Sequence, residues 1–512
     1  MTLSLDKLRR RAKALRKSYE NGAPTALARL RAFDPRAGSP LKHADFLHVI
    51  AREQNYPSWP KLKIAAETIG LDRASKQMRL RAALMQGQHW IVEHLLTETP
   101  NLADGDLGAQ VALYDVTAVE TVLQENPEAA LQLVGPRTPM MHLTFSKHFQ
   151  AHPEVRDDMM EMAKLLRWYG ADVNDAVPLQ NGVDHPLSAL YAALGHANNM
   201  VLAQWLLEQG ADPNDGESLY HSTELGHHEG LQMLLEHGAK PAGTNALLRA
   251  LDFNDHAAVQ MLINAGARVI EFNADPVGGE LPFVIPALHQ AARRMCDAQM
   301  IDLLLDAGAD PSTEYEGANA YAYARVFGNN DLARSIEARG LACDLTDVEN
   351  LLADAADGLD ARGQFIDPEK LPEAFRGMVG MMVAQDGRLS HIRRLVALGV
   401  EYDRADTQGM TPVQFAGWEG LPEVLAYFLQ LKPDLSHVNG YGGTLLSTIV
   451  HGAENCPRRA ERDHVACAKL SLEHGVALPA RQIELAGDED MAAFLNDWAE
   501  TFPGQVIEGV IA

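Results

Sequence analysis

The sequence lacks the features that mark secreted, membrane-spanning and disulfide-rich proteins. No uncharged apolar run of about 18 residues is present, which argues against a membrane span. The segment Met1–Arg11 carries charges where a signal peptide needs an apolar core, so we expect a cytoplasmic protein. The four cysteines form no Cys-x-x-Cys pair, and we expect them to be reduced and structural: Cys296, Cys343, Cys456 and Cys467.

Catalytic signatures are also missing. The sequence has no Gly-x-Ser-x-Gly elbow, no phosphate-binding Gly-x-x-x-x-Gly-Lys-Ser/Thr loop and no His-Glu-x-x-His motif. Its 20 histidines raise the question of a metal site, but their spacing does not favour one. Gly226, for example, is expected to end the helix that carries His221 before His227 is reached. We therefore predict no metal and no cofactor, and we favour a non-enzymatic protein.

The net charge of −25 is distributed unevenly. Residues 1–79 carry 17 Lys and Arg against 7 Asp and Glu, whereas the remainder carries 27 against 62. The acidic part is expected to repel nucleic acid, so any weak contact with nucleic acid would use the basic N-terminal part. A basic helix face that packs on its neighbours is the simpler alternative. The change in charge predicts a domain boundary near residue 75.

What the sequence does contain is a recurring helix pair. Thr411 and Pro412 predict a capped helix start, and Gly417 to Gly420 separates this helix from a second one with an apolar face. A hairpin this short cannot bury its own apolar face, so it needs neighbours. The ending of the second helix, a leucine-rich turn followed by glycine, returns at Gly170, Gly210, Gly238, Gly266, Gly308 and Gly475.

These residues resemble the ankyrin-repeat family, whose period matches the 33 residues between Thr411 and Thr444. The resemblance implies an all-α solenoid of about eleven helix-pair repeats, similar to bacterial arrays with a helical leader. We expect an N-terminal helical module at 1–75, the array at 76–478 and a C-terminal cap and tail at 479–512. Insertions that often map to the binding face are expected near 269–286, 356–375 and 452–462.

The resemblance also implies where a partner would bind. In ankyrin repeats, exposed positions four and seven residues after the turn threonine face the concave groove. Carried over to this sequence, the rule gives thirteen candidate binding residues: His142, Phe145, His221, Glu224, Arg249, Asp252, Gln290, Arg293, Arg294, Tyr323, Phe415, Trp418 and Glu419. Because neighbouring helices pack about 10 Å apart, the charged candidates from His221 to Arg294 are expected to form one strip.

Two functions follow from different interpretations of this strip. The favoured one is a non-enzymatic scaffold that binds a partner protein, one with a basic surface, in its acidic concave groove. The alternative is a pocket for a small anion, or an enzymatic site, in the groove of the central repeats. Arginines bind carboxylates and phosphates in a forked geometry, and a histidine beside a glutamate can exchange protons near neutral pH. A solvated, salt-bridged wall with no ligand is the plainest interpretation.

Overall fold

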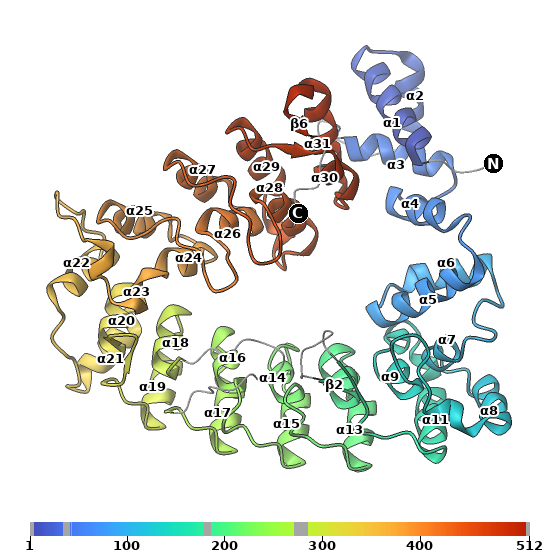
Figure 1. Cartoon of the computed structure of the whole chain (residues 1–512), viewed down its shortest axis with the longest axis horizontal. Coiled ribbons are helices and arrows are strands. Elements are labelled where there is room, and N and C mark those ends of the chain that lie inside the picture. The colour runs from blue at the N-terminus through green and yellow to red at the C-terminus, as the bar shows by residue number, and fades with distance from the viewer. Residues whose placement is uncertain (1–4, 34–40, 42, 179–185, 271–284, 508–512) are drawn as a thin grey trace. The chain divides into compact units, whose positions relative to one another are not determined.

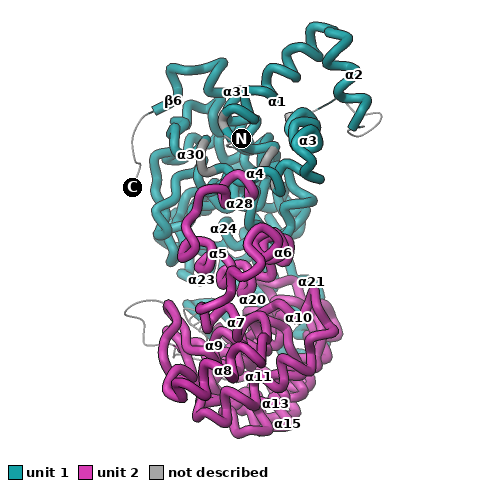
Figure 2. The backbone as a smooth tube through the Cα atoms, turned by 90° about the vertical axis from the view of Figure 1, so that its right-hand side faces the viewer, with its two compact units in different colours: residues 1–63, 311–512 teal, residues 64–310 magenta. Residues whose placement is uncertain are grey.

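The computed structural model describes residues 5–33, 41, 43–178, 186–270 and 285–507. It contains two compact units, one formed by residues 64–310 and the other by residues 1–63 together with 311–512 (Figure 2). Within the described residues, no helix is both long enough and apolar enough to cross a membrane. The expected insertion at 269–286 falls mostly outside the described residues.

The unit of residues 64–310 is a succession of short helix pairs that follows α4 (Trp59–Thr68) (Figure 1). Its helices are α5 (Arg73–Gln86), α6 (His89–Glu98), α7 (Leu107–Ala112), α8 (Val116–Glu125), α9 (Pro139–Thr144), α10 (His148–Ala151), α11 (Arg156–Trp168), α12 (Ala189–Tyr191), α13 (Met200–Glu208), α14 (Ser218–Ser222), α15 (Glu229–Glu236), α16 (Ala246–Asp252), α17 (His256–Asn264), α18 (Ala287–Arg293) and α19 (Ala298–Asp306). Strands β1 (Ala176–Pro178) and β2 (Pro186–Ser188) form an antiparallel pair in this unit.

Local sequence explains where these helices begin and end. At the start of α9, the Thr138 hydroxyl accepts a hydrogen bond from the Met141 N–H, and Pro139 occupies the first helical position. At the end of α13, Gly210 has a positive φ of 94°, and the Ala211 N–H donates to the Leu206 carbonyl at 2.9 Å. This is the closure that a glycine after a helix permits.

The repeats stack with corresponding helices side by side. First helices contact first helices, as α14 contacts α16 and α16 contacts α18, and second helices behave likewise, as α13 contacts α15. The stacked pairs confirm the predicted all-α repeat solenoid, with short strands added in the turns. Because of this stacking, equivalent positions on α14, α16 and α18 lie next to one another.

The second unit combines the two ends of the chain. It contains α1 (Leu5–Glu20), α2 (Pro24–Phe33), α3 (His43–Glu53), α20 (Ala320–Phe327), α21 (Asn330–Ala338), α22 (Asp347–Ala356), α23 (Glu373–Arg376), α24 (Met378–Val383), α25 (Leu389–Ala397), α26 (Pro412–Trp418), α27 (Pro422–Gln430), α28 (Leu445–Asn455), α29 (His464–Glu473), α30 (Ala480–Leu485) and α31 (Glu489–Thr501). Two short strand pairs accompany them, β3 (Glu314–Tyr315) with β4 (Ala318–Asn319), and β5 (Leu478–Pro479) with β6 (Val506–Ile507).

The N-terminal helices bury a core of their own, in which Leu8 and Leu15 of α1 meet Phe46 and Ile50 of α3. In addition, α3 contacts α31, and the Arg16 guanidinium lies 2.5 Å from the Asp497 carboxylate. Lys13 of α1 pairs with Glu500 in the same way. Part of the basic face of α1 therefore meets an acidic helix from the other end of the sequence, a contact that the sequence did not indicate.

Candidate functional site

Six polar side chains from three successive repeats form one hydrogen-bonded network, which we call the central ladder. They come from α14, α16, α18 and the residues that directly follow two of these helices: His221, Glu224, Arg249, Asp252, Gln290 and Arg294. Since the first helices stack, each repeat places its polar side chains beside those of the next. The structure thus brings most of the predicted charged strip together.

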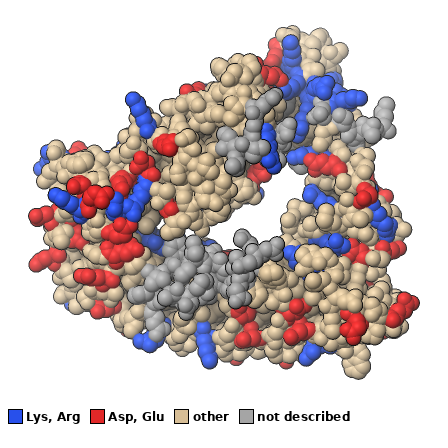
Figure 3. Space-filling view, viewed as in Figure 1, with Lys and Arg blue, Asp and Glu red and all other residues tan. Residues whose placement is uncertain are grey.

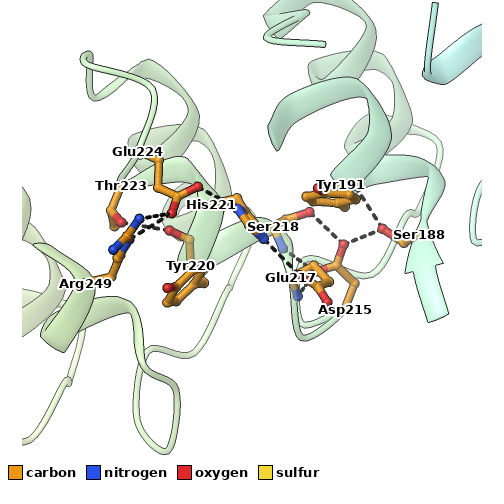
Figure 4. Close-up of polar contacts among 10 residues, drawn as sticks. All are labelled: Ser188, Tyr191, Asp215, Glu217, Ser218, Tyr220, His221, Thr223, Glu224 and Arg249. Atoms are coloured by element: carbon orange, nitrogen blue, oxygen red, sulfur yellow. Dashed lines mark hydrogen bonds and ion pairs between the residues drawn. The ribbon is translucent and has the colours of Figure 1, made fainter. Parts of the chain in front are cut away.

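His221 forms one end of the central ladder, held between two carboxylates (Figure 4). Its Nδ1 lies 2.7 Å from Glu224 Oε2, and its Nε2 lies 3.1 Å from Glu217 Oε2. Burial lowers the pKa of His221, but the hydrogen bonds and charges of the two carboxylates outweigh burial and raise this pKa to about 9. Both ring nitrogens therefore donate at neutral pH, and His221 is a cation.

Asp215 fixes the start of the helix that carries His221. Its carboxylate accepts hydrogen bonds from the Ser218 hydroxyl at 2.6 Å and the Ser218 N–H at 2.8 Å. The hydroxyl of Ser188, in the preceding repeat, also donates to Asp215 (Figure 4). Because both serines bond to the aspartate rather than to His221, this arrangement is a structural clamp and not a nucleophile with its base.

Arg249 is the centre of the central ladder. Its Nε and Nη2 lie 2.8 and 2.6 Å from Glu224 Oε1, and its Nη1 donates to Asp252 Oδ2 at 2.9 Å. The guanidinium also lies over the rings of Tyr220 and Phe253, at 5.6 and 4.9 Å from their centroids. Burial lowers the pKa of Arg249, but the neighbouring Tyr220, Asp252 and Glu224 outweigh burial and raise it.

Asp252 links Arg249 to the next repeat. Its Oδ1 accepts hydrogen bonds from the Gln290 amide and, at 2.8 Å, from Arg294 Nε. Arg293 donates its Nε–H to Gln290 Oε1 at 2.6 Å. Arg293 is buried, so it acts as a support for Gln290 beneath the ladder rather than as an exposed charge.

The charges of the central ladder compensate one another. The cations His221, Arg249 and Arg294 alternate with carboxylates, and their side chains are 20%, 29% and 42% exposed. A small anion would have to displace a carboxylate already bonded to Arg249, at the cost of an existing charge-assisted hydrogen bond. The arrangement instead offers a partly exposed row of donors and acceptors that are held in place by one another.

The expected exposure is wrong for five of the thirteen candidates. His142, Phe145, Gln290, Arg293 and Tyr323 are all at least nine-tenths buried. His142 donates its Nε2–H to the Val134 carbonyl at 2.9 Å, and Tyr323 stacks on Phe327 with 4.4 Å between ring centroids.

The last three candidates lie on or next to α26 in the other unit and are partly exposed. Trp418 contacts the His451 ring, with 5.4 Å between centroids. Burial raises the pKa of Glu419 despite the cations Arg462 and Arg458 nearby. Phe415, Trp418 and Glu419 therefore form a local surface of α26.

Other residues emerge only from the structure. Glu217 is almost fully buried, yet it supplies the second carboxylate to His221; its spacing four residues before His221 was the available signal. Arg137 and Lys147, in the turns on either side of α9, are also half-buried cations.

All four cysteines are free, and burial raises the pKa of Cys296 to about 12. The described residues include no group of three His, Cys, Asp or Glu side chains placed to hold a metal ion.

A family model agrees with this repeat architecture over part of the chain. Residues 189–273, which include α14 and α16, match the family model of ankyrin repeats in three copies. An ankyrin repeat domain from Acinetobacter baumannii AYE is similar, with 24% identity and a TM-score of 0.30 over 38% of this chain and 98% of that domain. The human ASB11 ankyrin repeat domain has 17% identity and a TM-score of 0.25 over 49% of this chain and 96% of that domain. No curated protein sequence matches the chain.

Proposed function

Because this chain is an ankyrin-repeat protein, we propose that it is a scaffold that binds a partner protein with the central ladder as part of its binding surface. Ankyrin repeats are in general modules for protein–protein interaction. The observation that carries the proposal is the continuity of the ladder, in which partly exposed side chains from three successive repeats form one bonded row.

The fixed geometry of the central ladder supports a protein partner. Arg249 and Glu224 already hold each other in place, so little side-chain freedom is lost when a partner binds. Arg249 is also packed against Tyr220 and Phe253, and arginines and aromatic residues are enriched where interfaces gain most of their energy. A small anion is less suited to this row, since the cations are occupied by carboxylates.

The charge of the chain supports a basic partner. The ladder itself is nearly balanced, but residues 80–512 carry 27 Lys and Arg against 62 Asp and Glu. An acidic field of this size attracts a basic protein from a distance and speeds its association, whereas contacts with the ladder set the lifetime of the complex.

The test separates the effect of the long-range acidic field from the effect of direct contacts with the central ladder. A partner is first captured from host lysate with the full chain as bait, and its affinity, association rate and dissociation rate are then measured by surface plasmon resonance. The double variant Glu224→Gln, Asp252→Asn keeps the shape of the ladder but removes two charges. We expect it to weaken binding about tenfold or more, mainly through faster dissociation.

The matched control removes the same charges from exposed positions on second helices, as Glu120→Gln, Asp157→Asn. This control should slow association slightly and leave the dissociation rate unchanged. Equal losses of affinity in the two double variants would show that only the long-range field matters, and the ladder would no longer be part of the binding surface.

A further inference from the structure

A second group of side chains, basic except for Phe145, lies in the unit of residues 64–310, around the turn that precedes α9. We call it the Arg137 cluster: Arg81, Arg137, His142, Phe145, Lys147 and His196. Figure 3 shows basic side chains over the α5 region of this unit, whereas acidic side chains gather along α13 and α15. The cluster thus belongs to a part of the chain, residues 80–512, whose net charge is negative.

The Arg137 cluster is held together by rings and backbone carbonyls. The Arg137 guanidinium lies over the Phe145 ring at 5.0 Å, and His196 meets the same ring edge-on at 5.0 Å. His196 Nε2 lies 2.9 Å from the Met85 carbonyl, and since a carbonyl only accepts, the ring must donate there. These contacts fix the side chains that surround Arg137 before any ligand arrives.

Arg81 lies beside the turn that carries Arg137. A Cβ atom placed on Gly135 would lie 3.7 Å from Arg81 Nη2, and one placed on Gly108 would lie about as close to Arg81 as to His142. Arg81 itself is paired with the buried carboxylate of Asp106. Its charge is therefore compensated, and the surplus charge of the cluster comes from other residues.

Arg137 and Lys147 supply this surplus. Within the described residues neither side chain pairs with a carboxylate, and Arg137 Nε is buried without a hydrogen-bond partner. Burial lowers the pKa of both groups, and no acidic neighbour opposes the effect. Burial, together with the nearby cations, also lowers the pKa of His142 to about 4, so this histidine is neutral at pH 7.

The Arg137 cluster therefore contains two half-buried positive charges, on Arg137 and Lys147, and one buried donor, Arg137 Nε, without a hydrogen-bond partner. Burying a cation without a partner is unfavourable, and a bound anion would remove that penalty. A phosphate monoester carries a charge of about −1.5 to −2 near pH 7 and presents three acceptor oxygens. Arginine binds phosphate in a forked geometry, and lysine adds a point charge.

We propose that Arg137 and Lys147, supported by Phe145 and His196, form a binding site for a phosphate monoester group. The group belongs either to a small phosphorylated molecule or to a phosphorylated side chain of a partner. The site is distinct from the central ladder, whose arginines are already occupied, and it does not depend on the scaffold function proposed above.

The test is calorimetric titration of the full chain with inorganic phosphate and with O-phosphoserine, at constant ionic strength and with serine as the blank. The wild type should bind both phosphate compounds saturably. Arg137→Gln and Lys147→Gln should each weaken binding roughly tenfold to a hundredfold, as expected for loss of a charged hydrogen-bond donor. Tighter binding of phosphoserine than of phosphate indicates a phosphorylated side chain as the ligand, and equal binding indicates a free phosphate compound.

The control is Arg334→Gln, which removes an arginine that is 70% exposed and lies in the other unit. It should bind phosphate as the wild type does. Melting curves without phosphate provide a second measurement, because Arg137→Gln removes an unpaired buried cation and should melt no lower than the wild type. The proposal is overturned if the wild type shows no saturable binding, or if both Arg137→Gln and Lys147→Gln retain wild-type affinity.

Discussion

Two half-buried arginines in the same unit, Arg249 and Arg137, have opposite surroundings. Arg249 is bonded to Glu224 and Asp252, and its pKa is raised. Arg137 lies over an aromatic ring with no carboxylate partner among the described residues, and its pKa is lowered. The difference shows that an arginine in a repeat array can either form ion pairs that stabilise the array or remain without a carboxylate partner and so be able to bind an external anion.

The histidines beside the two arginines differ in the same way, since one is charged and the other is neutral. His221 in the central ladder is bonded to two carboxylates and is charged, with a pKa of about 9. His142 in the Arg137 cluster donates to a backbone carbonyl and is neutral, with a pKa of about 4. A ligand anion would therefore meet a closed, balanced network at the ladder and uncompensated positive charge at the cluster.

The largest expected effect comes from removing the paired arginine. Arg249→Ala leaves Glu224 and Asp252 without their shared cation and removes the guanidinium that lies over the rings of Tyr220 and Phe253. We expect a loss of about 3 kcal/mol in the free energy of unfolding, at the lower end of what breaking a buried ion pair costs because the site is partly exposed.

Urea denaturation of the full chain measures this loss as a lower midpoint. Arg137→Ala is the matched change at the unpaired arginine. When no phosphate is present, it should change the free energy of unfolding by less than about 1 kcal/mol. Equal losses in the two variants would contradict the distinction between a paired and an unpaired arginine.

The next effect is a pH dependence with a known sign. The folded pKa of His221, about 9, lies above the unfolded value of about 6.5. Its stabilising contribution is therefore complete below about pH 6.5 and is lost as the pH rises through about 9. The size is on the order of 2 kcal/mol, reduced from the full shift because the side chain is 20% exposed.

Melting temperatures between pH 6 and 10 measure this dependence. The wild type should lose stability towards pH 10, and His221→Gln should lose less over the same range. His142 has the opposite sign: because its folded pKa lies below the unfolded one, it should destabilise the protein as the pH falls from about 6.5 to about 4. A wild-type curve that matches His221→Gln from pH 6 to 10 would contradict the charged state of His221.

The repeats could be predicted from the sequence because their signals are local. A Thr-Pro helix start such as Thr138-Pro139, and a glycine after a leucine-rich turn such as Gly210, determine helix ends within a few residues. Stacking of similar repeats then places equivalent positions together, so the line from His221 to Arg294 could be anticipated. The number of repeats remains a prediction.

The contact partner of each arginine could not be predicted, because it depends on which side chain a neighbouring element places beside it. Arg249 meets Glu224, whereas Arg137 meets Phe145, and no spacing in the sequence distinguishes the two. Burial was also missed. The rule that places His142 in an exposed groove does not anticipate that its ring donates to the Val134 carbonyl and is buried there.

The contact between α1 and α31 lay beyond local patterns as well, since Arg16 and Asp497 are 481 residues apart. It provides a third kind of basic site, paired like Arg249 but with a more exposed carboxylate, since the Asp497 side chain is 43% exposed and that of Glu224 is 27% exposed. Exposed ion pairs contribute little, so Asp497→Asn, Glu500→Gln should lower stability by less than about 1 kcal/mol, and by less still at high salt.

The same variant tests the basic face of α1, because it releases Lys13 from Glu500 and Arg16 from Asp497, leaving Arg16 paired only with Glu20. If these pairs compete with external anions, the double variant should bind a single-stranded oligonucleotide more tightly than the wild type at low salt, as measured by fluorescence anisotropy. Binding that is equal in both proteins would show that pairing within the chain does not limit the basic face of α1.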